Sequence, residues 1–143
     1  MKMFDLTGKT ALVTGGGQGV GAGIAKVLSD AGASVVVNDF HADRAEKVAA
    51  DVGGRPLPFD VADREAVQRS IDSVGQIDIL VNNAGIPPSM RPVQFREMDP
   101  AEWAPYVDVN LYGVLNCVKA TIDGMCERIE DEPLEFAVIG DGG

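Results

Sequence analysis

Glycine is concentrated in one short stretch of the sequence, TALVTGGGQGVGAG at Thr10–Gly23, where six of the ten residues from Thr14 onward are glycine. Glycine inside a helix costs about 1 kcal/mol relative to alanine, so this density is unfavourable unless bare backbone is needed there. A strand that runs into glycines and then into a helix can bind a pyrophosphate, because free amides and the positive helix end attract the anion. A G-x-G-x-x-A pattern is present at Gly17, Gly19 and Ala22. We therefore predict a phosphate-binding loop in this stretch.

Asp39 ends the next apolar run, ASVVVND, at about the 20-residue offset where an acid meets the adenosine ribose of a bound dinucleotide. Its carboxylate can accept both ribose hydroxyls. It would repel a 2′-phosphate by up to about 4 kcal/mol per charge pair at about 4 Å and an effective dielectric of about 20. No arginine or lysine lies between Thr14 and Ala25 to offset this repulsion, and Phe40 follows Asp39. We therefore predict NAD as the cofactor in preference to NADP.

The elements that would position these residues follow from the hydrophobic pattern. Strands are predicted at residues 10–14, 33–39, 55–59 and 77–81, with helices between them at residues 20–31, 41–53 and 63–74. Gly32 and Gly53 would end the first two helices, and Asp63 would cap the third. Strands that are apolar on both faces and alternate with helices predict a parallel sheet with helices on each side.

A long helix is predicted from Asp99, as its N-cap, and Pro100, in its first turn, and Pro105 should kink or restart it. The helix carries two apolar stripes. One comprises Val107, Leu111, Val114, Val118, Ile122 and Met125, and the other comprises the smaller residues Val109, Gly113, Cys117, Ala120 and Gly124. One stripe can pack on the sheet. The other indicates either the close approach of another helix, from this chain or a second subunit, or simply a crowded core.

Length and composition exclude several classes of protein. With 143 residues, the chain can bury a core without metals or disulfides. Its 12 basic and 22 acidic residues give a net charge of −10, which argues against nucleic acid or an anionic membrane as partner. No apolar run is long enough to span a bilayer, and the N-terminus has no signal-peptide pattern. Cys117, Cys126 and a single histidine fit no metal-ligand spacing, so we expect reduced thiols, no metal and a cytoplasmic location.

Four motifs together resemble the short-chain dehydrogenase/reductase family. They are TGGGQGVG, which fits the pattern TGxxxGxG, FDV at Phe59–Val61, NNAG at Asn82–Gly85, and DVNLYG around Asn110. The motifs follow the family's order and spacing, and the resemblance covers roughly residues 6–128. It implies a Rossmann-like, doubly wound α/β fold with a parallel sheet of about five strands. It also implies a nicotinamide cofactor and the interconversion of small-molecule alcohols and ketones.

The resemblance also assigns a role to each motif. The pyrophosphate would lie along the glycine loop, the ribose on the acid after the second strand, the adenine beside FDV, and the rest of the cofactor along NNAG. The binding residues would be Gly15, Gly17, Gln18, Gly19 and Val20 for the pyrophosphate, Asp39 for the ribose, Asp60 and Val61 for the adenine, and Asn83 for the rest of the cofactor. NNAG is as consistent with a structural clasp, because asparagine side chains can tie neighbouring strands together. Asn110 would be the catalytic-helix asparagine, whose backbone carbonyl at a helix kink holds a water of the proton relay.

The other catalytic residues of that family are missing from the sequence. The family uses a serine, a tyrosine, and a lysine four residues after the tyrosine that lowers its pKa from about 10. Tyr106 and Tyr112 are each followed four residues later by asparagine, and no serine follows Ser89. Tyr112 and Lys119 are too far apart on one helix for direct pairing. We therefore expect no appreciable dehydrogenase activity from this chain alone.

Residues 129–143, IEDEPLEFAVIGDGG, differ from the rest of the chain. LEFAVIG at residues 134–140 is a candidate fifth strand, but GDGG stands where the family has serines. We expect one NAD-binding Rossmann domain over residues 1–143, family-like over 6–128, with an atypical tail and truncated relative to the family. Two alternatives stay open. One is a non-catalytic NAD-binding module that pairs through the helix at residues 107–126, and the other is a non-functional gene fragment with an exposed strand edge.

Overall fold

The computed structural model describes residues 4–86 and 94–128 of the chain. These residues form a sheet of four strands in the order β3-β2-β1-β4, and every neighbouring pair is parallel. The strands are β1 (Thr10–Val13), β2 (Ser34–Val37), β3 (Arg55–Pro56) and β4 (Ile79–Val81). Leu12 of β1 lies opposite Val36 of β2 and Leu80 of β4, so an apolar row crosses the sheet. The predicted parallel sheet is confirmed for these four strands.

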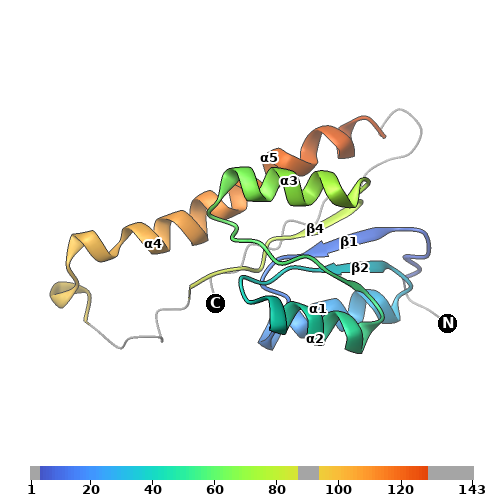
Figure 1. Ribbon diagram of the computed structural model, residues 1–143, viewed down its shortest axis with the longest axis horizontal. Coiled ribbons are helices and arrows are strands. Elements are labelled where there is room, and N and C mark those ends of the chain that lie inside the picture. Colours follow the sequence, from blue (N-terminus) through green and yellow to red (C-terminus); the bar gives the residue numbers. More distant parts are fainter. Residues whose placement is uncertain (1–3, 87–93, 129–143) are drawn as a thin grey trace.

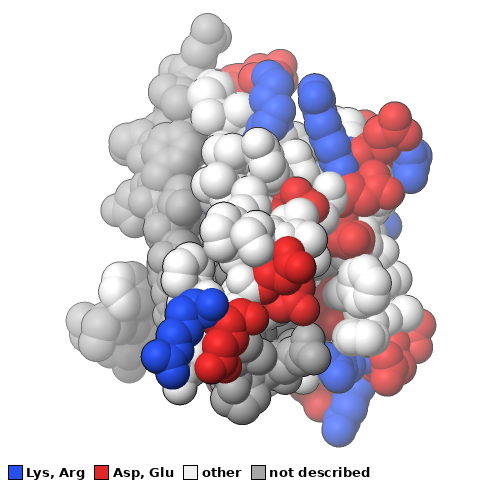
Figure 2. All heavy atoms as spheres, turned by 90° about the vertical axis from the view of Figure 1, so that its left-hand side faces the viewer, with Lys and Arg blue, Asp and Glu red and all other residues white. Residues whose placement is uncertain are grey.

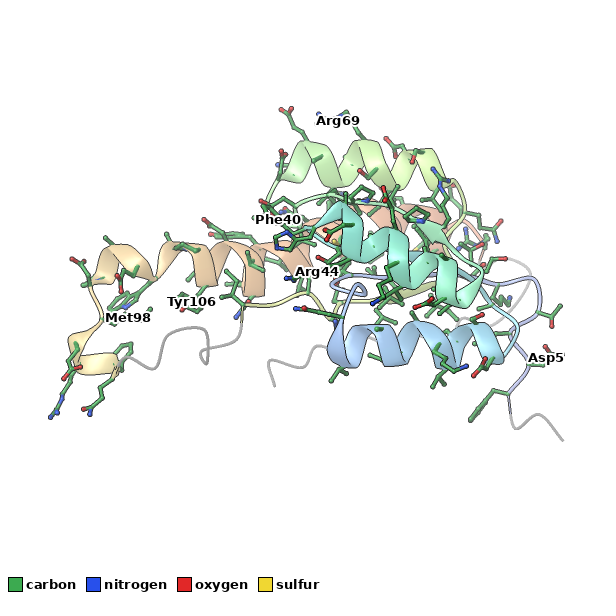
Figure 3. The ribbon with its side chains drawn as sticks, turned by 60° about the horizontal axis from the view of Figure 1, so that its bottom comes forward. Asp5, Phe40, Arg44, Arg69, Met98 and Tyr106 are labelled. Carbon is green, nitrogen blue, oxygen red and sulfur yellow. The ribbon has the colours of Figure 1, made fainter. Side chains whose placement is uncertain are left out.

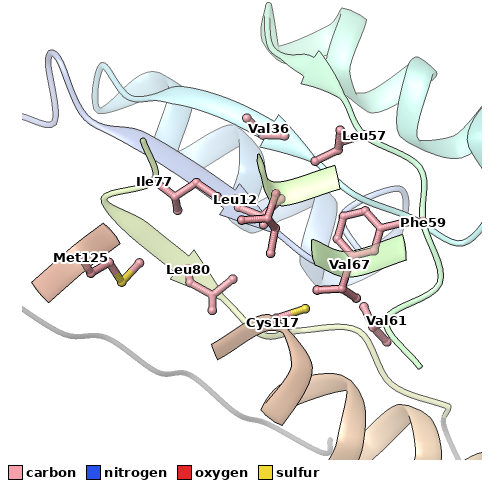
Figure 4. Close-up of a cluster of buried hydrophobic side chains, with 11 residues drawn as sticks. Leu12, Val36, Leu57, Phe59, Val61, Val67, Ile77, Leu80, Cys117 and Met125 are labelled. Carbon is pink, nitrogen blue, oxygen red and sulfur yellow. The ribbon is translucent and has the colours of Figure 1, made fainter. Parts of the chain in front are cut away.

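Helices cover both faces of the sheet, as predicted (Figure 1). One face carries α1 (Gly19–Asp30) and α2 (Ala42–Val52), and the other carries α3 (Arg64–Val74) and α5 (Gly113–Cys126). Successive residues of β1 point to opposite faces. Ala11 and Val13 join the apolar cluster on the α1–α2 side, and Leu12 joins the cluster on the α3–α5 side, shown in Figure 4. The central strand is therefore buried on both faces, which explains its continuous apolar sequence.

Two of the predicted helix-end signals act as expected. Gly53 ends α2 with a left-handed φ of 66°, and Asp63 caps α3 by accepting a hydrogen bond from the Ala66 N–H at 3.0 Å. β3 is shorter than the predicted strand at 55–59. Leu57 and Phe59 remain buried beyond the end of β3. The Leu57 N–H still donates to the Val37 carbonyl at 2.9 Å, and the carbonyls of Leu57 and Phe59 accept hydrogen bonds from the Asn38 side chain.

The predicted long helix is divided into shorter pieces that project past one end of the sheet (Figure 1). Two 3₁₀ turns, Phe95–Glu97 and Pro100–Glu102, precede α4 (Ala104–Val107). Asp99 caps the second turn, and Pro105 lies in the first turn of α4, so the proline restarts the helix. A π-helical segment, Asp108–Tyr112, joins α4 to α5. The local distortion expected near Asn110 is therefore present.

α5 packs on the core through buried Gly113, Cys117, Thr121 and Met125. Gly113 and Cys117 belong to the small-residue stripe, so these small side chains serve close packing within the chain. The larger stripe is divided, because Met125 is buried in the core and Val118 packs against it, whereas Val107, Leu111 and Ile122 stay exposed. Residues of both stripes therefore reach the core, and the expectation that one whole stripe packs on the sheet is only partly right.

The candidate fifth strand at residues 134–140 lies outside the described residues. The assignment of a single domain with an atypical tail stays a prediction. Within the described ranges, no helix is long and apolar enough to cross a membrane. Figure 2 views the molecule from the side on which α4 projects, where the visible Lys and Arg side chains stand among Asp and Glu.

Candidate functional site

The predicted site residues lie where three neighbouring parallel strands end. The glycine loop follows β1, Asn38 and Asp39 follow β2, and Asn82 and Asn83 follow β4. In open α/β sheets, ligands bind outside the carboxyl ends of the strands. Because β1 lies between β2 and β4 in the sheet, its glycine loop is flanked by the polar residues of both neighbours.

The glycine loop needs glycine for two physical reasons. Gly15 and Gly19 adopt left-handed φ values of 60° and 54°, which favour glycine. At Gly21 the reason is space, because a Cβ there would lie 2.3 Å from the carbonyl oxygen of Gly15 and 2.6 Å from Nδ2 of Asn83. The first turn of α1 is therefore held directly against the loop.

The N-terminus of α1 meets the requirements of an anion site. The N-cap residue Gln18 makes no side-chain capping hydrogen bond, and the first turn carries no acidic residue. The first amides of a helix have no partner within the helix, so those of α1 are left for another acceptor. Gly19 has open space where a Cβ would stand, and the neighbouring Val20 is 70% exposed. A phosphate group therefore fits this end of the helix.

Asp39 is fixed against the glycine loop. Its Oδ2 accepts a hydrogen bond from the Gly17 N–H at 3.1 Å, and its Oδ1 accepts one from the His41 N–H at 2.9 Å. The residue is only 6% exposed. The fold thus brings Gly17 and Asp39 together, and the buried carboxylate keeps lone pairs that can accept further hydrogen bonds.

Asn38 organises the site, although sequence reasoning gave it no role. Its Oδ1 accepts from the Gly15 N–H at 3.3 Å, and its backbone carbonyl accepts from the Gly16 N–H at 2.7 Å. Its Nδ2 donates to the carbonyls of Leu57 and Phe59 at 3.1 and 3.0 Å. Asn38 is 1% exposed. The only signal in the sequence is a polar residue that ends an apolar strand directly before the acid.

Asp60 and Val61 form a turn after β3 that is docked on α5. Asp60 Oδ1 accepts a hydrogen bond from the Ala62 N–H at 2.9 Å. The carbonyl of Val61 accepts one from Nδ2 of Asn116 at 2.9 Å. A Cβ at Gly113 would lie 2.6 Å from Val61 Cγ2, so α5 and this turn are in close contact. Asn116 is a second positioning residue that the sequence did not single out.

Asn83 forms a clasp between the ends of β1 and β4. Its Nδ2 donates to the carbonyls of Thr14 and Gly15, both at 3.1 Å, and its backbone N–H donates to Thr14 Oγ1 at 3.0 Å. NNAG therefore acts as a structural clasp that ties neighbouring strands together, which is the alternative that the sequence analysis gave for this motif. Asn82 is buried, and its Nδ2 has no hydrogen-bond partner among the described residues.

Asn110 lies in the middle of the π-helical segment and uses its side chain to hold the chain after β4. Its Oδ1 accepts from the Ile86 N–H at 2.8 Å, and its Nδ2 donates to the Ile86 carbonyl at 3.3 Å. π-helical turns interrupt the regular helix ladder and occur frequently at functional sites. The fold therefore connects Asn110 to the segment that follows NNAG.

The described residues near Asn110 provide no acid–base pair. Tyr112 is 53% exposed, and neither it nor Lys119 makes a hydrogen bond or ion pair with the part of the chain that the structure describes. Burial raises the pKa of the Cys117 thiol to about 12, so the thiol stays protonated at neutral pH. This arrangement can bind a dinucleotide, but these side chains do not supply a poised proton donor.

The chain is similar in sequence and in fold to known proteins. A family model described as short chain dehydrogenase matches residues 9–131. Oxidoreductase UcpA of Salmonella typhimurium is 41% identical over 135 residues, which cover 88% of this chain and 50% of that protein.

Two solved structures extend the likeness to the fold. The 3-ketoacyl-(acyl-carrier-protein) reductase from Brucella melitensis, complexed with NADH, matches with a TM-score of 0.86 and 32% identity over 92% of this chain and 57% of that one. The gluconate 5-dehydrogenase from Burkholderia cenocepacia J2315, in complex with NADP and tartrate, matches with a TM-score of 0.78 and 39% identity over 89% of this chain and 52% of that one. The chain thus spans about half the length of these relatives.

Proposed function

This chain belongs to the short-chain dehydrogenase/reductase family, and from that premise we propose that it forms the cofactor-binding part of an NAD-dependent oxidoreductase that interconverts alcohols and carbonyl compounds. One observation carries the proposal. The carboxylate of Asp39 is fixed on the amide of Gly17, beside a helix N-terminus that has no capping side chain. A ribose acceptor and an anion site therefore lie next to each other.

Each part of the site has a task in this proposal. The loop Gly15, Gly17, Gln18, Gly19 and Val20 binds the pyrophosphate, and Asp39 accepts the ribose hydroxyls. Asp60 and Val61 flank the adenine, and Asn83 lies along the cofactor while it clasps β1 to β4. When bound, NAD supplies the hydride acceptor. Asn110 contributes its backbone carbonyl, in the π-helical segment, to the relay of protons.

The preference for NAD over NADP rests on the charge of Asp39. A 2′-phosphate would stand next to this buried carboxylate, and like charges repel strongly where water is excluded. Because one relative was solved with NADH and another with NADP, the family likeness does not decide this choice.

We further propose that the 143-residue chain alone has no appreciable turnover. Its sequence contains no YxxxK and no serine after Ser89. Loss of a general acid alone typically costs about 10²–10⁴ in rate. The alternative function is a non-catalytic NAD-binding module. It is favoured by the lack of YxxxK and of a serine after Ser89 in this sequence, together with the intact glycine loop.

The test is a fluorescence titration of the purified chain with NADH and, separately, with NADPH. We expect saturable NADH binding and much weaker NADPH binding. The difference in affinity between the two cofactors should be smaller in Asp39→Asn, because that variant loses the negative charge. Equal affinity for both cofactors would overturn the NAD assignment. Steady turnover of secondary alcohols with NAD by the purified chain would overturn the proposed lack of activity.

We propose a cytoplasmic protein that takes small-molecule substrates, in keeping with its net charge of −10 and two free cysteines. We also propose that it pairs with a second copy through the helix at residues 107–126, where the apolar side chains of Val107, Leu111, Leu115 and Ile122 are exposed.

A further inference from the structure

The π-helical segment that carries Asn110 receives little support from the core. Neither α4 nor the segment Asp108–Tyr112 contains a buried residue. Val109 is half-buried and packs against the core cluster on the α3–α5 side. In Figure 3, Tyr106 and Met98 lie on the same part of the chain, which projects away from the sheet. Short helical pieces are marginal in water without packing, so the position of this segment depends on contacts at its ends.

Gly113 connects one end of the segment to the turn after β3. Its N–H donates to the Asp108 carbonyl, five residues earlier, and this hydrogen bond closes the π turn. A Cβ at Gly113 would lie 2.6 Å from Val61 Cγ2, so the backbone of α5 lies directly against the Val61 side chain. The end of the π turn is therefore held at Val61.

Asn116 holds Val61 in this contact. It lies three residues after Gly113, a spacing that places both on the same side of a helix. Its side chain is half-buried, and its Nδ2 donates to the Val61 carbonyl at 2.9 Å. Gly113 thus contacts the side chain of Val61, while Asn116 binds the carbonyl of the same residue.

Asn110 connects the segment to the chain that follows β4. Its side chain bonds both the N–H and the carbonyl of Ile86. A Cβ at Gly85 would lie 3.4 Å from Asn110 Oδ1, so this side chain also lies next to the backbone of the NNAG motif. The turn after β3, the π-helical segment and the chain after β4 are therefore linked in series.

We propose that Asn116 is a positioning residue that fixes the π-helical segment on Val61 and thereby holds Asn110 on Ile86. The inference rests on the proposed function, because that function uses the backbone carbonyl of Asn110. Without the Asn116 hydrogen bond, the first turn of α5 is less firmly attached to the turn after β3. The Asn110–Ile86 hydrogen bonds then open more often.

The competing explanation is local. Asn116 would then only satisfy the Val61 carbonyl and add to the stability of the whole fold. Its loss would increase global unfolding, but the local opening at Ile86 would not change. Backbone hydrogen exchange, followed residue by residue by NMR, separates the two explanations, because local and global openings are read at different amides.

The experiment measures exchange at the Ile86 amide, which reports its hydrogen bond to Asn110. We expect Asn116→Ala to speed exchange there about five- to tenfold, the size of one lost hydrogen bond. Asn116→Gln keeps the amide donor and should recover part of the protection. Arg128→Ala is the matched control, because Arg128 donates to the Ile77 carbonyl from the opposite end of α5. The control should leave exchange at Ile86 unchanged.

The amide of Leu12, in the central strand, reports global unfolding in each variant. If Asn116→Ala speeds exchange at Leu12 but not at Ile86, the positioning role is wrong. The role is also wrong if Arg128→Ala speeds exchange at Ile86 as much as Asn116→Ala does. An NADH titration of the wild-type chain tests the proposed function separately. If NADH does not bind and Ile86 responds as expected, the proposed function is wrong while the positioning of Asn110 stands.

Discussion

Asp78 shows how one carboxylate can join two strands at the end of the sheet opposite the candidate site. Its Oδ2 accepts from the Thr10 N–H at 2.7 Å, and its Oδ1 accepts from the Gln76 side chain at 2.9 Å. Arg128 lies 3.5 Å from the same carboxylate. Burial raises the pKa of Asp78, but these hydrogen bonds and the charges of Arg128 and Lys9 outweigh it and hold the pKa below its ordinary value of 3.8.

Asp78→Asn is expected to lower the free energy of unfolding by about 1–2 kcal/mol at neutral pH, because it weakens charge-assisted hydrogen bonds at a largely buried position. A carboxylate with a depressed pKa stabilises the fold above its unfolded pKa of 3.8, and this contribution is lost as the pH falls through the folded pKa. The difference between wild type and variant should therefore shrink in acid. Urea denaturation across a pH series measures this difference in the free energy of unfolding.

Asp51→Asn is the matched control for that series, because Asp51 lies on the exposed side of α2. The control should change stability little at any pH. A difference between wild type and Asp78→Asn that stays constant down to acidic pH would contradict the role of the charge. It would then point to packing or geometry as the cause.

At the residue scale, the sequence was informative wherever a residue type served a local need. Asp39 could be predicted, because an acid directly after an apolar strand has few structural uses. Arg44 could not, because only the packing of α2 against the glycine loop brings it next to Gly17. The loop itself contains no arginine or lysine, whereas the fold brings Arg44 to it from the next helix. Asn38 was missed for the same reason, since its partners come from the loop after β1 and from the segment after β3.

At the scale of elements, two of the three glycines in α1 meet opposite structural demands. Gly21 faces the glycine loop, where a Cβ would lie 2.3 Å from the Gly15 carbonyl oxygen. Gly23, two residues later in the same helix, has nothing within 4 Å of the corresponding position. The first glycine is therefore required by contact between elements, and the second only costs the helix conformational entropy.

We expect Gly21→Ala to destabilise the protein by about 1–3 kcal/mol, because the methyl group forces α1 away from the loop. Gly23→Ala should instead stabilise it by about 0.5–1 kcal/mol, because alanine restricts the unfolded chain at a compatible helical position. Chemical denaturation of both variants gives the two free energies. A similar change of stability in the two variants would contradict the close contact between α1 and the glycine loop.

The elements differ in how far sequence alone could define them. β1, β2 and the helices between the strands were predictable, since their apolar periodicity and end signals agree. The helix expected from Asp99 was not, because its pieces depend on distant contacts. The π-helical segment is held where Asn110 binds Ile86, and α5 begins where Gly113 meets Val61. The apolar periodicity of the sequence does not predict such contacts between distant segments.

At the scale of the whole molecule, the two faces of the sheet are covered differently. On both sides, an apolar cluster lies between strands and helices. On the α3–α5 side, however, a row of apolar residues faces away from the core. This row is the exposed stripe of Val107, Leu111, Leu115 and Ile122, which are 43%, 54%, 51% and 36% exposed. Apolar residues gathered along one helical region commonly mark a protein–protein contact.

We expect the exposed stripe to hold two copies of this chain together, so that the mass in solution is twice the 15.0 kDa of one chain. Leu115→Glu should convert the protein to a monomer, because a charge buried in an apolar contact without a partner is costly. Light scattering coupled to size-exclusion chromatography measures the mass. Leu115 is the chosen position because it is exposed and lies outside the candidate cofactor site.

Val27→Glu is the matched control, because Val27 is 67% exposed on α1, on the opposite face of the sheet. It adds the same charge to another exposed apolar position, so a general effect of charge on association would appear in both variants. The stripe is the contact surface if only Leu115→Glu is monomeric. A wild-type chain that is already monomeric, or a loss of dimer in both variants, would contradict pairing through α5, and the exposed stripe would then need a different partner.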